Sequence, residues 1–289
     1  MEDKSKRAIV SIGTTALGDV AKDAVTEMLF PGSGLLGTLI GPVVATLSED
    51  FIHREMSKSE NTRLRFVGEN VVSKVQARLD AGDQPRRDDD FYINDDYGQS
   101  SASKLLEEIL LKCKQEFEAK KLISYSNFWA NICFENGISY EVANSLIAQF
   151  SSLSYQQVKL LIYLCADNTV PLNNWEKYMF TEEILEPYYT LYSDFLHLYS
   201  TRLARAVETA NGAIQVGTPE ICISPSGKLM CRLLELKLPD EEMNDLSDYI
   251  QSVNGIVTRL RNEAGDNGRD NELTFATGED VDKIMEGLT

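Results

Sequence analysis

Residues 211–234 have the sequence NGAIQVGTPEICISPSGKLMCRLL, and this stretch decides the fold that we predict. Its two short runs at 213–216 and 220–224 flank Gly217-Thr218-Pro219, and such runs around a glycine-containing turn predict a β-hairpin. Pro225 suits the first position of a following helix, because its missing N–H would have no helical partner there.

The chain before this hairpin contains two further helical patterns. Ser154, with Gln157 three residues later, predicts a capped helix start. A second helix is predicted from about residue 187 to about residue 211. An aromatic stripe at helical spacing predicts its buried face: Tyr188, Tyr192, Phe195, Tyr199 and Leu203. Helix, loop, helix, hairpin and helix over residues 153–238 is the element order of a winged-helix-like module.

The N-terminal half shows the 3.6-residue apolar period of helices that share a core. Gly82 is a predicted helix stop, and Phe117 and Val142 are assigned to buried faces. Four helices are predicted here, over residues 49–81, 101–122, 125–134 and 139–150. The fold class is therefore mainly α: a helical bundle followed by a winged-helix-like module with one small β-hairpin.

Composition shifts divide the chain into five parts. The linker is rich in aspartate, but its spacing does not fit an EF-hand loop, so we predict a solvated loop. The C-terminal part contains a predicted helix from Pro239 to about Asn262 and much of the acidity of the chain. The five parts are an apolar hairpin with a long helix (1–82), the acidic linker (83–99), a helical bundle (100–152), the winged-helix-like module (153–238) and an acidic helix with a tail (239–289).

Charge and cysteine usage restrict the setting in which the protein works. The net charge of −17 argues against a general affinity for nucleic acid or anionic lipid, because phosphate binding needs clustered Lys and Arg. The odd number of cysteines, five, with no CxxC pair, predicts reduced thiols. The N-terminal residues lack the pattern of a signal peptide, so we expect a cytoplasmic protein, with membrane association as the alternative.

The residues that usually carry catalysis are absent or scattered. His53 and His197 are the only histidines, and they lie in different predicted helices. No phosphate-binding loop or nucleophile elbow is present, and the glycines at 32, 34 and 37 follow no strand. We therefore expect no catalytic residues, no cofactor, no metal and no small-molecule substrate, and we do not predict an enzyme.

The stretch from Met28 to Ser48 carries no charged residue and has two interpretations. One is a buried helical hairpin whose glycines allow close backbone approach. The other is a hairpin, spanning about residues 8–47, that inserts into a membrane or forms oligomers. The residues expected to make these membrane or oligomer contacts are Leu35, Leu36, Gly37, Leu39, Ile40, Gly41 and Val44.

The winged-helix-like module also raises the question of DNA binding. Arg202 and Arg205 would lie near the end of a recognition helix, and Lys228 would follow the wing. A DNA-reading module usually shows a clear basic stripe, and this region has nearly balanced charges. Protein contact is therefore the favoured use of the module, and a DNA-binding regulator is the alternative.

Several phrases of the chain resemble the Abi-alpha type of bacterial protein, a family associated with abortive infection. They are the glycine-rich start leading into a long helix (41–81), Phe128-Trp129-Ala130-Asn131, Leu153-Ser154 opening the next helix, and the junction at 223–228. The resemblance covers about residues 30–240 and supplies no catalytic residues. It implies a bacterial or phage-encoded helical protein in antiviral defence. Our leading hypothesis is a non-enzymatic protein that acts through a protein partner or self-association.

Overall fold

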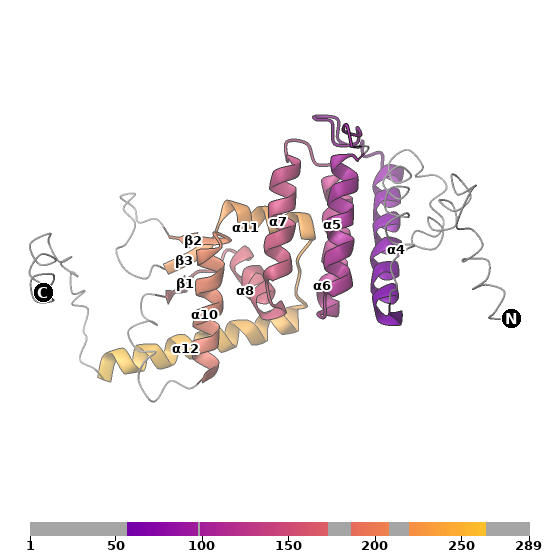
Figure 1. The fold of residues 1–289 in the computed structure, drawn as a ribbon. Coiled ribbons are helices and arrows are strands. Elements are labelled where there is room, and N and C mark those ends of the chain that lie inside the picture. The colour runs from indigo at the N-terminus through magenta and orange to yellow at the C-terminus, as the bar shows by residue number, and fades with distance from the viewer. Residues whose placement is uncertain (1–56, 98, 173–185, 208–219, 264–289) are drawn as a thin grey trace, which may run out of the picture.

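The computed structural model describes residues 57–97, 99–172, 186–207 and 220–263. Within these residues the chain is mainly helical, as predicted, with eight helices and one three-stranded antiparallel sheet. Figure 1 shows the helices α4 to α7 standing side by side, the sheet at the opposite end of the molecule from α4, and α12 crossing beneath.

Helix α4 (Lys58–Asp80) begins with a capping box. The Ser57 hydroxyl accepts a hydrogen bond from the Glu60 backbone N–H at 3.2 Å, and the Glu60 carboxylate accepts one from the Ser57 N–H at 2.7 Å. The helix stops before Gly82, as predicted, because Gly82 adopts a φ of 90° that closes the last turn. The single helix predicted over 49–81 is wrong at Ser57, whose backbone is extended, with ψ of 159°. The first part of that prediction, 49–56, lies outside the described residues.

The single helix predicted over 101–122 is wrong, because the chain forms α5 (Ser101–Gln115) and then α6 (Ala119–Ile132). Glu116 has an extended backbone, and its carboxylate lies 2.7 Å from the buried ammonium of Lys121. This ion pair holds the reversal between the two helices. Phe117, which was assigned to the core, lies in the turn and is 92% exposed.

Helix α7 (Tyr140–Ser152) and helix α8 (Tyr155–Cys165) follow. The predicted capping box of Ser154 and Gln157 is confirmed at the start of α8. Val142 is exposed rather than buried, since α7 turns a different set of side chains to the core: Ala143, Leu146, Ile147 and Phe150.

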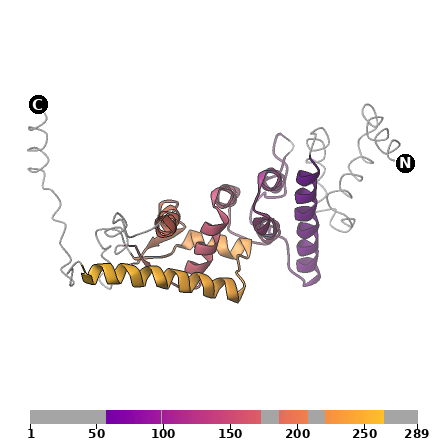
Figure 2. The same ribbon diagram turned by 90° about the horizontal axis from the view of Figure 1, so that it is seen from below.

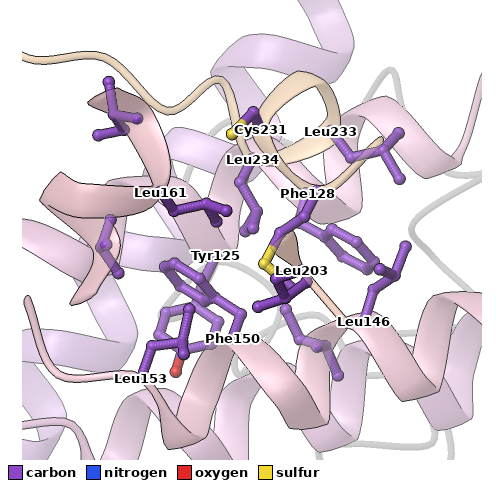
Figure 3. Packing of buried hydrophobic residues seen from close by; sticks show 14 of the residues in the cluster. Tyr125, Phe128, Leu146, Phe150, Leu153, Leu161, Leu203, Cys231, Leu233 and Leu234 are labelled. Carbon is purple, nitrogen blue, oxygen red and sulfur yellow. The ribbon is translucent and has the colours of Figure 1, made fainter. Parts of the chain in front are cut away.

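Helix α6 lies at the centre of the core, and α4, α5 and α11 all pack against it. Its Tyr125, Phe128 and Trp129 side chains are fully buried. Figure 3 shows Tyr125 and Phe128 beside Leu146 and Phe150 of α7, with residues of the later elements on the same cluster, among them Leu161, Leu203 and Leu234. One continuous apolar core therefore joins the bundle to the elements that follow it.

The acidic linker is more than a solvated loop, so that prediction is wrong for part of it. Phe91 and Arg86 are both buried. The Arg86 guanidinium donates hydrogen bonds to the carboxylates of Asp88 and Asp89 and stacks 4.6 Å from the Phe91 ring centroid. A buried guanidinium must be paired, and Asp88 and Asp89 supply the partners of Arg86. These two carboxylates therefore bind a side chain of their own segment.

The sheet consists of β1 (Val170–Pro171), β2 (Ala204–Ala206) and β3 (Glu220–Ile223) in the order β1-β3-β2. Both pairs are antiparallel, with Val170 opposite Ile221 and Arg205 opposite Cys222. Strand β3 matches the second strand of the predicted hairpin, whereas the first predicted strand, 213–216, lies outside the described residues.

Helix α10 (Glu186–Ser200) ends well before the predicted position near residue 211. Arg202 adopts a left-handed conformation with φ of 62°, and the Leu203 N–H donates to the Leu198 carbonyl at 2.9 Å. This is a Schellman cap, which usually carries glycine at the left-handed position, so its sequence signal is absent here. The chain then enters β2, and Arg205 lies on a strand instead of a helix.

Helix α11 (Pro225–Leu234) begins at the predicted proline, and α12 (Asp240–Glu263) follows it. The Ser224 hydroxyl accepts from the Gly227 N–H at 2.9 Å and donates to the Arg202 carbonyl at 2.7 Å. This one side chain therefore caps α11 and ties it to the end of α10. Figure 2 shows α12 running along one side of the molecule, where Lys120 of α6 pairs with Glu242 at 3.1 Å.

The close approach of α11 to the turn after α10 requires glycine at position 227. A Cβ added there would lie 2.2 Å from the Leu203 carbonyl oxygen and 2.5 Å from Cδ1 of Ile223. We expect Gly227→Ala to lower the free energy of unfolding by about 1–3 kcal/mol, measured by urea denaturation.

Gly255→Ala is the matched control, because a Cβ at this exposed site inside α12 meets no atom within 4 Å. It should raise the free energy of unfolding by about 0.5–1 kcal/mol, since alanine restricts the unfolded chain. Equal stability of the Gly227→Ala variant and the wild type would contradict the packing described here.

Candidate functional site

The residues predicted to make membrane or oligomer contacts lie outside the described residues, so both interpretations of that stretch stay predictions. They are Leu35, Leu36, Gly37, Leu39, Ile40, Gly41 and Val44. Among the helices that the structure does describe, none combines the length and the apolar character needed to cross a membrane.

The three residues predicted for nucleic-acid contact lie on three different elements. Arg202 is in the turn after α10 and Arg205 is on β2, so neither lies on a recognition helix. Lys228 lies on α11 and pairs with Asp167 at 3.2 Å. The prediction that Arg202 and Arg205 lie near the end of a recognition helix is therefore wrong.

The two faces of the sheet differ in character. Ala204, Ile221 and Ile223 are buried against the core. Because side chains alternate along a strand, Arg205 and its register partner Cys222 lie on the other face. Glu220 lies on the same face as Cys222, so this face carries one positive and one negative side chain beside the thiol and is no continuous basic surface.

Helix α10 has a buried face and an exposed face, and among the side chains that the structure describes, 189–200, the exposed face carries no Asp, Glu, Lys or Arg. Its buried side chains include Tyr192 and Phe195, as predicted, whereas Tyr199 of the same predicted stripe is 37% exposed. Tyr189 is 55% exposed, and positions 193, 196 and 200 follow it along the helix at four- and three-residue steps. We call this surface the α10 outer face: Tyr189, Ser193, Leu196, Tyr199 and Ser200.

The carboxylate of Asp194 points away from this face. Asp194 accepts a hydrogen bond from the side-chain amide of Gln157 on α8 at 2.9 Å. The helix contains no Lys or Arg. Since the wet face of a surface helix normally carries charged residues, an uncharged face with two tyrosines stands out as a candidate contact surface.

Sequence reasoning missed the α10 outer face because it assigned the whole aromatic stripe to the core. Tyr189 is one residue out of step with that stripe, so it could not join the same buried face. The absence of Lys and Arg from 186–200 was also visible in the sequence, and together these two signals could have identified the face.

Side chains of α6 hold the C-terminal end of α11, and through it the later elements. The side-chain amide of Asn127 donates to the Leu234 carbonyl at 3.0 Å, and that of Asn131 donates to the Leu233 carbonyl at 2.9 Å. These carbonyls have no partners within their own helix. Arg78 of α4 donates to the Asn131 side-chain oxygen at 2.9 Å and fixes its orientation.

Glu235 completes this junction between α6 and α11. It ends α11 in a left-handed conformation, with φ of 49°, and its carboxylate pairs with Lys74 of α4 at 2.7 Å. Burial acts to raise the pKa of Glu235, but the hydrogen bonds from Lys74 and Asn131 outweigh it, so the pKa lies below its ordinary value. The carboxylate is therefore ionised, and the ion pair present, at neutral pH.

All five cysteines are free thiols in the structure. Burial raises the pKa of the Cys133 thiol to about 12 and that of Cys113 further, so both behave as buried apolar side chains. The described residues contain no group of three or more His, Cys, Asp or Glu side chains placed to hold a metal ion.

Comparison with known proteins finds no matching family model, no matching curated protein and no matching solved structure.

The hydrogen bond from Asn127 to α11 gives a direct test of the junction. Asn127→Asp replaces a buried donor with an oxygen that faces the Leu234 carbonyl. We expect the free energy of unfolding to fall by about 2–4 kcal/mol at neutral pH, because the Leu234 carbonyl loses its donor and the new carboxylate is buried beside it without one. Chemical denaturation followed by circular dichroism measures this change.

Asn70→Asp is the matched control, since the Asn70 side chain bonds only to the Phe66 carbonyl of its own helix and is partly exposed. Its effect should stay within about 0.5 kcal/mol. A similar loss in both variants would show that the junction has no special role in stability.

Proposed function

We propose that the protein acts by binding a protein partner through the α10 outer face, without catalysis, in bacterial antiviral defence. The observation that carries the proposal is the exposed, uncharged, tyrosine-bearing face of α10. The defence context comes from the resemblance of the chain to the Abi-alpha type. The expected place of action is the cytoplasm.

The order of the elements supports a winged-helix-like arrangement for this module. Helix α8, β1, α10, β2, β3 and α11 succeed one another, and the sheet order β1-β3-β2 places β3 between the other two strands. In DNA-binding proteins of the helix-turn-helix type, the second helix of the motif is presented to the partner. In such an arrangement α10 would correspond to that second helix, which supports its exposed face as the contact surface.

Electrostatics favour a protein as the occupant over a nucleic acid. Helix α10 has no Lys or Arg, and Lys228 is already paired with Asp167. Helix α12 exposes the acidic side chains of Glu241, Asp245 and Asp248, which repel phosphate. Tyrosine, in contrast, contributes large contact area with a polar tip and is enriched at protein interfaces.

The double variant Tyr189→Ala/Tyr199→Ala tests the α10 outer face. We expect it to lower affinity for the partner at least about tenfold, because truncation of an interface tyrosine often costs more than 1 kcal/mol. The partner is first identified by placing a photo-cross-linking residue at position 189 in cells with and without phage. Binding of wild type and variant to that purified partner is then compared by calorimetry.

Phe66→Ala is the matched control, because Phe66 on α4 is also exposed, at 41%, but lies on a different surface. It should bind the partner like the wild type. Unchanged affinity of the double tyrosine variant would reject the face, and unchanged phage sensitivity after gene deletion would reject the defence role.

A gel-shift experiment at low salt separates the protein-binding proposal from a DNA-binding regulator. We expect no shift with duplex DNA of mixed sequence, since phosphate contacts need clustered cations. A shift that disappears in the Arg202→Ala/Arg205→Ala variant would instead favour nucleic acid as the partner and would overturn the proposal.

A further inference from the structure

Two cysteines that are far apart in the sequence lie side by side in the fold. Cys165 is the last residue of α8, and Cys231 lies in α11, which packs against α8. Lys228 lies three residues before Cys231, on the same side of α11, and its ammonium is 3.2 Å from the carboxylate of Asp167, two residues after Cys165. This contact brings the two thiols together, and a hydrogen bond joins them. In Figure 3, Cys231 lies at the edge of the buried cluster, beside Leu234.

The two thiols differ in exposure. Cys165 is partly exposed, whereas Cys231 is buried. The ion pair of Lys228 and Asp167 lies beside them, and the positive charge of the Lys228 ammonium lowers the pKa of the Cys165 thiol. The Cys165 sulfur is thus accessible to a small reagent and lies near a positive charge, whereas the Cys231 sulfur next to it is buried.

We propose that Cys165 and Cys231 form a redox-active dithiol that a hydroperoxide oxidises reversibly to an intramolecular disulfide. In the first step the Cys165 thiolate attacks one peroxide oxygen, the O–O bond breaks, and the other oxygen takes up a proton and leaves, as water from hydrogen peroxide or as an alcohol from an organic hydroperoxide. Cys165 is then a sulfenic acid. In the second step the Cys231 sulfur attacks the Cys165 sulfur, the S–O bond breaks, and water leaves with the Cys231 proton.

Each thiol has the acidity that its step needs. The hydrogen bond from Cys231 lowers the pKa of Cys165, burial opposes this, and Lys228 adds to the lowering, so the net pKa lies below its ordinary value. The hydrogen bond to Cys165 and burial raise the pKa of Cys231. Because Cys165 is the partly exposed thiol and Cys231 the buried one, Cys165 is the attacking thiolate and Cys231 is the resolving thiol, in agreement with these directions.

The disulfide would join the end of α8 to a helix that is held elsewhere by Asn127 and Asn131 of α6. It would close the loop of chain that contains β1, α10, β2 and β3. Because such a crosslink restricts the unfolded chain, oxidation should raise the melting temperature of the protein. The proposed disulfide does not depend on the partner-binding role of the α10 outer face, and each proposal has its own test.

The test begins with the reduced full-length protein, treated with hydrogen peroxide in slight excess. Intact mass should fall by the mass of two hydrogen atoms, and dithiothreitol should restore it. Peptide mapping without reduction should find Cys165 linked to Cys231. A stable sulfinic acid at Cys165, a disulfide that includes another cysteine, or no reaction would each overturn the proposal, and none of these readouts needs a variant.

Cys222→Ser is the matched control, since Cys222 is also partly exposed but lies on the outer face of β3. This variant should form the disulfide as the wild type does. Cys231→Ser should instead stop at the sulfenic acid, which dimedone traps, and its melting temperature should not rise with peroxide. If the Cys222→Ser variant also failed to form the disulfide, the assignment of Cys165 and Cys231 as the pair would be contradicted.

Discussion

Two asparagine side chains of α6 hold the C-terminal end of α11, and most of the later elements depend on this contact. Asn127 and Asn131 satisfy carbonyls that the helix itself leaves without partners. Helix α11 is tied in turn to the end of α10 through Ser224, and Ser224 directly follows β3. A short polar junction therefore positions the sheet and α10 relative to the bundle, while the shared apolar core supplies the bulk of the stabilisation.

Two helix ends in left-handed conformations set the path of the chain around this junction. Arg202 ends α10 and directs the chain into β2, and Glu235 ends α11 where Lys74 and Asn131 meet it. A residue with a Cβ is strained in this conformation, so the surrounding contacts must maintain it. For Arg202 the supporting contacts are the cap bond from Leu203 to Leu198 and the hydrogen bond from Ser224 to its carbonyl.

The placement of charge gives the C-terminal module its proposed character. Basic side chains are dispersed over a turn, a strand and a helix, and acidic side chains line the exposed face of α12. The α10 outer face is neither basic nor acidic and carries two tyrosines. For this reason we propose a protein surface as its occupant. The Cys165 and Cys231 pair lies where α8 packs against α11, and no residue of the α10 outer face belongs to it.

The sequence by itself determined the mainly helical class, the capped start of α8, the start of α11 at Pro225, the stop at Gly82 and strand β3. Each of these rests on local chemistry: a hydroxyl three residues before its partner, a glycine at positive φ or a proline at a helix start. Only the tertiary structure decided the break at Glu116, the early end of α10 and the meeting of Cys165 with Cys231. Those features depend on partners distant in the chain or on strain held by packing, such as the buried Lys121 ion pair and the Arg202 cap. No periodicity or local motif encodes them, because the residues that stabilise them come together only when the core forms.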